Sequence, residues 1–248
     1  MTEIKSIAAL VSCENLKIYQ QWKYRILLAV TAIIIIASAS VSMIPGNILS
    51  FTMANYPYTI LSLLNYIIAP LAVFMLASDL LSGEMAGSEI RVLLTRPVSR
   101  FNVLLSKVLA IAGYAGLMLA GGFLLSGILS SIFTGFSPPN IFTALTAYAV
   151  GFLPLLTLIT MSVMIASTMK SATSSFGACL ITYLGFVVIG VIFSGLSPAL
   201  FTSYLNIGSM VIGSVIPLSS LLAGIAILTG YSLAFLSVSG LKFAYMEF

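Results

Sequence analysis

The side chains best suited to chemistry are three carboxylates in one polar stretch, residues 79–107: Asp79, Glu84 and Glu89. Carboxylate oxygens are the ligands that hard divalent cations prefer, so one hypothesis is a metal-dependent enzyme acting, for example, on a lipid phosphate. The acids are spaced five residues apart and basic residues are interleaved with them. Acids three or four residues apart would share one helix face. The observed spacing therefore argues against this enzyme.

The sequence also lacks the residues required for a zinc site or for an ATP-binding loop. The chain has no His and two Cys, so no zinc site of the usual His/Cys kind can be assembled from it. A Walker A loop ends in Gly-Lys-Ser/Thr, and in Lys170-Ser171 the lysine follows Met169 instead of glycine. We expect no metal and no cofactor on this chain, and no ATP-binding loop of its own.

Composition indicates a protein inside a membrane. Of its 248 residues 60% are hydrophobic and 6% are charged, against about 25% charged in soluble domains. Six apolar runs reach the roughly 20 residues that cross a bilayer as a helix. The expected spans are 26–44, 58–78, 108–130, 143–168, 176–195 and 218–240. We predict an all-α membrane protein with six transmembrane helices, in one transmembrane domain over residues 1–248.

The positions of the charged residues predict the orientation. All sixteen precede span one, follow span six, or lie between spans two and three or four and five. Lys and Arg near span ends mark the cytoplasmic side, which puts both termini and residues 79–107 in the cytoplasm, with the plasma membrane as the expected location. The net charge of +4 is then explained by contact with the lipid membrane, and no nucleic-acid partner is expected.

Three further segments of the sequence predict local structural features. Residues 1–25 suit a helix on the inner membrane surface; a signal peptide cleaved near Ala37-Ser38-Ala39 is the competing reading, disfavoured by two Glu residues in a long leader. Residues 196–217 predict a short helix or a re-entrant hairpin at the outer face. Span two contains Pro70, which removes a backbone donor and can kink the helix, and Asn65, a weak candidate for lining a pathway.

The polar stretch predicts a small amphipathic helix between Gly87 and Pro97. Ile90, Leu93 and Leu94 fall on one face of it, because they are spaced three and four residues apart. Proline disfavours helix in the residue before it, so this helix ends near Arg96.

At this point a resemblance becomes specific. The run Glu84-x-x-Gly87-Ser88, then Leu93-Leu94-Thr95-Arg96-Pro97-Val98-Ser99-Arg100, then Lys107, resembles the signature of ABC exporter permeases of the type 2 family. Two positions depart from the family pattern, Ser88 for the usual Thr and Thr95 for the usual Ser. Both keep a hydroxyl group.

The resemblance implies that residues 79–107 form a cytoplasmic coupling helix, which docks on a separate ABC ATP-binding subunit carrying ATP and Mg²⁺. It implies a second permease chain, identical or different, and export of an amphipathic or hydrophobic substrate. The residues expected to couple the chain to the ATPase are Glu84, Gly87, Ser88, Ile90, Arg91, Leu93, Leu94, Arg96, Pro97, Arg100 and Lys107. The alternative is a scaffold or sensor subunit that keeps this fold without transport.

The predicted orientation can be tested by labelling single cysteines in intact cells. A cysteine placed near Asn140 is expected to react with a membrane-impermeant maleimide added outside, whereas one near Arg96 reacts only after permeabilisation. The reverse pattern of labelling would overturn the orientation.

Overall fold

Every regular element of the described chain is a helix. The computed structural model describes residues 2–42, 55–87, 99–134, 138–211 and 218–245. Within them, six stretches are long and apolar enough to cross a membrane: Trp22–Ser40, Tyr56–Ala86, Arg100–Phe133, Ile141–Ala166, Ala172–Ile192 and Ser219–Phe243. The prediction of an all-α protein with six membrane-spanning helices is confirmed.

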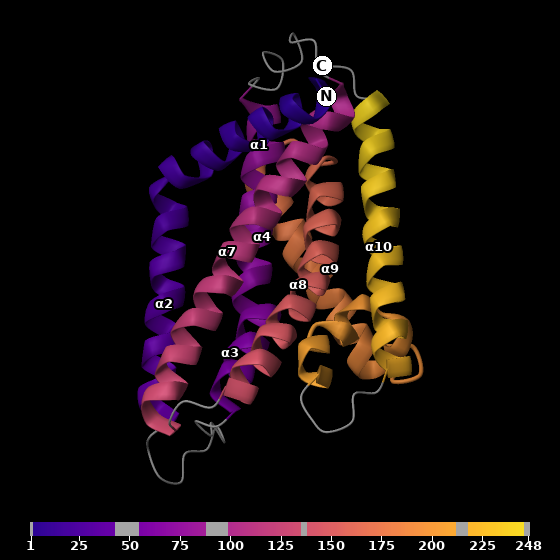
Figure 1. Cartoon of the computed structure of the whole chain (residues 1–248). Coiled ribbons are helices and arrows are strands. Elements are labelled where there is room, and N and C mark those ends of the chain that lie inside the picture. The colour runs from indigo at the N-terminus through magenta and orange to yellow at the C-terminus, as the bar shows by residue number, and fades with distance from the viewer. Residues whose placement is uncertain (1, 43–54, 88–98, 135–137, 212–217, 246–248) are drawn as a thin grey trace.

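The helices run up and down, so that α1 begins and α10 ends at the same end of the molecule (Figure 1). The first span is α2 (Trp22–Ser42) and the third to sixth are α7 (Arg100–Thr134), α8 (Pro138–Ala166), α9 (Ala172–Ile192) and α10 (Leu218–Tyr245). The charged residues of the described chain belong to helix ends and connections on this side. We call it the charged end and the opposite side the uncharged end.

The N-terminal helix α1 (Thr2–Gln20) lies across the charged end at a steep angle to α2 (Figure 1). The chain bends at Gln21, whose N–H donates to the Ile18 carbonyl and whose carbonyl accepts from Tyr24 N–H. One face of α1 packs on α7 and buries Ile18, while Leu16 is 60% exposed. A helix therefore forms where residues 1–25 predict one, and its two faces differ in burial.

The second span is the most buried of the six and is built from five consecutive helical pieces. These are α3 (Tyr56–Leu63), the π-helical turn η2 (Leu64–Ile68), α4 (Ala69–Ala77), the π-helical turn η3 (Ser78–Gly83) and α5 (Glu84–Ala86). A π-turn carries one extra residue per hydrogen-bonded ring and changes which side chains face each neighbouring helix.

Pro70 lies just after η2, which closes through a hydrogen bond from Ala69 N–H to the Leu64 carbonyl. Proline has no N–H, so it cannot serve the carbonyl four residues earlier, that of Tyr66. The Tyr183 hydroxyl of α9 donates to that carbonyl instead, at 2.9 Å. The Tyr66 carbonyl, which cannot accept a hydrogen bond from Pro70, therefore attaches α9 to span two through Tyr183.

At the uncharged end, residues 197–211 fold back onto the bundle as three short 3₁₀ turns. These are η4 (Ser197–Ala199), η5 (Phe201–Tyr204) and η6 (Ile207–Val211). Phe201, Leu205 and Ile207 are buried, and Gly208 lies so close to α8 that a Cβ there would be 2.4 Å from the Ala147 carbonyl oxygen. The short helical segment predicted before span six is therefore packed against α8; residues 212–217 of that prediction lie outside the described chain.

The attachment of α9 predicts a double-mutant result. Tyr183→Phe is expected to lower the free energy of unfolding by about 1 kcal/mol, because the Tyr66 carbonyl loses its partner. In a Pro70→Ala background, residue 70 regains an N–H and the cost of Tyr183→Phe should shrink. Thermal unfolding of the four proteins in one detergent measures both costs, and equal costs in the two backgrounds would contradict this role of Tyr183.

Candidate functional site

A buried charge cluster joins three elements at the charged end. The ammonium group of Lys107, in α7, lies 2.6 Å from Oε2 of Glu84 in α5 and 3.1 Å from Oε1 of Glu14 in α1. Lys17 of α1 reaches Oε1 of Glu84 at 2.9 Å and Oε2 of Glu14 at 3.8 Å. We call these four residues the charge quartet.

The charge quartet balances two positive and two negative charges, three of which are buried. The Lys107 side chain is 0% exposed, that of Glu14 3% and that of Glu84 9%, whereas Lys17 keeps 40% of its surface. An unpaired buried charge is very costly, and removing one partner of a buried pair typically costs about 3–5 kcal/mol. α1, the end of span two and the start of α7 are therefore held in one arrangement by a common requirement for neutrality.

A second polar contact lies beside the quartet and attaches α2. The Asp79 carboxylate of η3 accepts from the Lys23 ammonium and the Tyr24 hydroxyl, both on α2. The Tyr114 hydroxyl of α7 then donates to the Tyr24 carbonyl at 2.9 Å. Spans one, two and three are thus joined at the charged end by side chains of η3, α2 and α7.

Asn65 makes the corresponding attachment nearer the uncharged end. Its Nδ2 donates to the carbonyls of Gly151 in α8, at 3.1 Å, and of Leu205, at 3.0 Å. Asn65 is 0% exposed, and its Oδ1 has no hydrogen-bond partner in the described chain. Gly151 is needed for this approach, because a Cβ there would be 3.0 Å from Leu61 and 3.2 Å from Asn65 Nδ2.

The stabilisation from the two hydrogen bonds that Asn65 donates is close to the cost of leaving its Oδ1 without a partner. Interhelical hydrogen bonds in membranes average about 0.6 kcal/mol each, whereas a buried acceptor without a partner costs about 1–3 kcal/mol. Asn65 therefore specifies how η2, α8 and Leu205 meet more than it stabilises the bundle.

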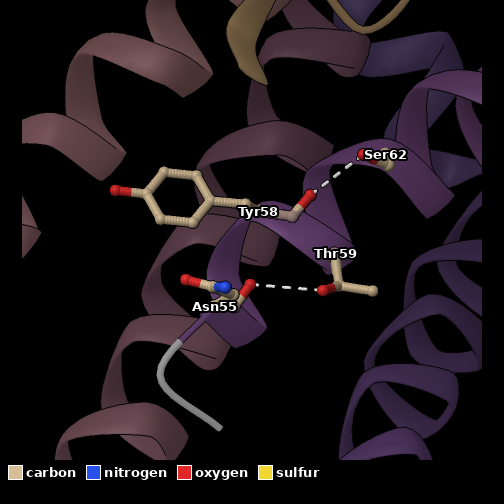
Figure 2. A pocket seen from close by; sticks show the side chains of 4 residues that line it. All are labelled: Asn55, Tyr58, Thr59 and Ser62. Atoms are coloured by element: carbon tan, nitrogen blue, oxygen red, sulfur yellow. Dashed lines mark hydrogen bonds between the residues drawn. The ribbon is translucent and has the colours of Figure 1, made fainter. Parts of the chain in front are cut away.

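A pocket of about 270 Å³ opens at the uncharged end, lined by Asn55, Tyr58, Thr59 and Ser62. Figure 2 shows the Thr59 hydroxyl bonded to the Asn55 carbonyl and the Ser62 hydroxyl bonded to the Tyr58 carbonyl. Ser62 also donates to Oδ1 of Asn206, at 2.9 Å, between η5 and η6. The lining side chains that the structure describes are polar and uncharged.

The family follows from comparison of the whole chain with known proteins. The family model described as ABC-2 family transporter protein matches residues 10–188, from α1 into α9. The chain belongs to the ABC-2 transporter family. It is therefore a transmembrane permease component of an ABC transporter. Comparison with curated proteins finds no match.

Within this ABC-2 permease, the structure brings together two of the residues expected to couple it to an ATPase. Glu84 and Lys107 contact each other directly, and Gly87 N–H donates to the Gly83 carbonyl at 3.0 Å. Arg100 begins α7, where Ser99 Oγ accepts from Asn102 N–H at 3.3 Å. The others, Ser88, Ile90, Arg91, Leu93, Leu94, Arg96 and Pro97, lie outside the described residues.

Sequence reasoning missed the α1 half of the quartet, Glu14 and Lys17. A signal for Glu14 was present: it falls between Val11 and Ile18 on the stripe of α1 that packs inward. An acid on an apolar stripe predicts a buried partner of opposite charge. The weak pathway candidate Asn65 is enclosed in this structure and contacts backbone carbonyls, so a pathway role for it stays a prediction.

The charge quartet predicts a large loss of stability when its buried cation is removed. Lys107→Met is expected to lower the free energy of unfolding of the permease by about 3–5 kcal/mol, because two buried carboxylates lose their neutralising charge. Adding Glu14→Gln and Glu84→Gln should recover most of that loss.

The matched control is Lys242→Met, which removes an exposed lysine from the last turn of α10. It should change stability by less than about 0.5 kcal/mol. Thermal unfolding in detergent provides the comparison, and equal effects of the two single substitutions would contradict the importance of the buried ion pairs.

Proposed function

We propose that this chain is the permease subunit of an ATP-driven exporter, coupled to a separate ATP-binding subunit through residues 84–100. The observation that carries the proposal is the contact between Glu84 and Lys107, at 2.6 Å, which closes the base of the connection between spans two and three. Because this ion pair joins the end of span two to the start of span three, a force applied to the connection would move both spans together.

The quartet extends this coupling to the N-terminal helix. Glu14 and Lys17 contact the same two residues, so α1 would follow the connection when it moves. α1 continues through the bend at Gln21 into α2, which Asp79 holds through Lys23 and Tyr24. In the proposed mechanism, closure of the ATP-binding subunits would move spans one, two and three as one unit.

The docking residues proposed on the connection are those expected from the sequence. Ile90, Leu93 and Leu94 would supply an apolar face for a groove on the ATP-binding subunit. Arg91, Arg96 and Arg100 would meet carboxylates or carbonyl groups at its rim. ATP and Mg²⁺ would bind that partner, and a second permease chain, identical or different, would complete the pathway.

The proposed orientation places the charged end and both termini in the cytoplasm, with the chain in the plasma membrane. Its support is that all ten Lys and Arg residues fall in segments assigned to that end, as the positive-inside rule requires. The proposed substrate is amphipathic or hydrophobic. A charged solute would need an ionic partner inside the bilayer, and the described spans carry their formal charges only near the charged end.

Co-purification tests the proposed function. When the native protein is extracted in mild detergent, an ATPase with a P-loop is expected to purify with it in comparable amount. Leu93→Asp should abolish this association, because it places a charge in the proposed apolar contact. Mass spectrometry of the purified sample identifies and quantifies the partner.

The control is Leu196→Asp, the same change at an exposed residue of the uncharged end, which should leave the partner bound. A permease that purifies alone under conditions that preserve membrane complexes would favour the scaffold or sensor function instead. Retention of the ATPase by Leu93→Asp would place the docking surface elsewhere.

A further inference from the structure

One face of span two stays open although this span is the most buried of the six. From Asn55 to Met75, the residues that are not buried recur every three or four positions. They are Asn55, Tyr58, Thr59, Ser62, Leu63, Tyr66, Ile67, Leu71 and Met75. This spacing places them on one side of the helical stretch, which the other described helices cover only in part.

The chemistry of this open face changes along its length. At the uncharged end it carries the polar pocket of about 270 Å³ lined by Asn55, Tyr58, Thr59 and Ser62. Toward the middle of the span it carries large apolar side chains: Tyr66 is 40% exposed, Ile67 55% and Leu71 39%. The face is therefore polar and uncharged at its outer part, and apolar at membrane depth.

The pocket offers hydrogen bonds without offering charge. Thr59 and Ser62 donate their hydroxyl hydrogens within the chain, so their oxygen lone pairs remain as acceptors. Asn55 makes no side-chain hydrogen bond to cap α3, and its carboxamide contains both donors and an acceptor. Such a site suits a hydroxyl or amide group. A phosphate or ammonium group would lose hydration there without gaining an ionic partner.

We propose that the open face of span two binds one amphiphile with an uncharged head, its hydroxyl- or amide-bearing group in the outer pocket and its apolar chain along Tyr66, Ile67 and Leu71. This proposal assigns a substrate class to the permease. Transport of that substrate rests on the proposed function, whereas binding to the open face does not depend on it. The match between the polar-to-apolar order of the face and that of such a molecule is the argument for this occupant.

Photolabelling in vesicles of phosphatidylethanolamine and phosphatidylglycerol tests the site. The probe is a monoacylglycerol carrying a diazirine in its acyl chain, compared with a probe of identical chain and a phosphate head. The glycerol-headed probe is expected to label the peptide containing Tyr66 to Leu71, and the phosphate-headed probe to label it several-fold less. Mass spectrometry of the digested protein gives both yields.

The matched variants separate pocket binding from general lipid contact. Thr59→Val with Ser62→Ala should lower labelling by the glycerol-headed probe roughly fivefold, about the effect of one lost hydrogen bond. Ser131→Ala with Thr146→Val removes one serine and one threonine hydroxyl that donate within their own helices, and should leave labelling unchanged.

Two results would overturn the proposal. Equal labelling by both probes would mean that this face contacts only bulk lipid. No labelling by either probe would mean that no amphiphile binds this face, and disulfide formation between copies carrying Ile67→Cys in a Cys13→Ser, Cys179→Ala background would then identify a second copy as what covers it.

Neither measurement requires an ATPase, so the site and the proposed function can fail separately. Labelling of a permease that purifies alone would support the binding site and contradict the exporter. If an ATPase does purify with the chain, the glycerol-headed probe is expected to stimulate its hydrolysis of ATP, and the phosphate-headed probe is not.

Discussion

Burial of a single ammonium group sets the arrangement of the charged end. Lys107 has no exposed surface, so its charge must be matched by carboxylates that arrive from other helices. Span two contributes Glu84 and α1 contributes Glu14. If either helix moved away, a buried charge would lose its partner. The cluster contributes little net stability relative to an apolar core of similar volume. Its effect is to select one packing of three helices from many that an apolar surface would allow.

The uncharged end is held together by weaker interactions than the charged end. There the contacts are neutral, and Asn65, Ser62 and Tyr148 bond to neighbouring elements one or two hydrogen bonds at a time. Because neutral interhelical bonds are worth little in a membrane, this end can exchange partners at low cost. We therefore expect the uncharged end to rearrange more easily than the charged end.

The sequence predicts the six spans well, because the length of an apolar run is a local property. It underestimates span two, which continues past residue 78 to Ala86. The extra turns contain Asp79 and Ser82, whose polar groups lower the hydropathy but bond to α2 and α8. Glu84 and Lys107 were found through a family pattern, yet the pairing of Lys107 with Glu14 is a contact between residues 93 positions apart, which no local pattern encodes.

Six side chains of the described chain make one common kind of hydrogen bond to another element. Tyr114, Tyr148, Tyr183, Asn65, Ser82 and Thr157 all donate to main-chain carbonyls of other elements. Every residue type supplies a carbonyl, so the accepting side needs no particular side chain to form the bond, apart from Gly151, where the close approach of Asn65 leaves no room for a Cβ. In evolutionary terms, each such joint can be lost by mutation at its donor but hardly at its acceptor. Outside close approaches such as the one at Gly151, the accepting helix can therefore change its side chain at the contact without losing the hydrogen bond.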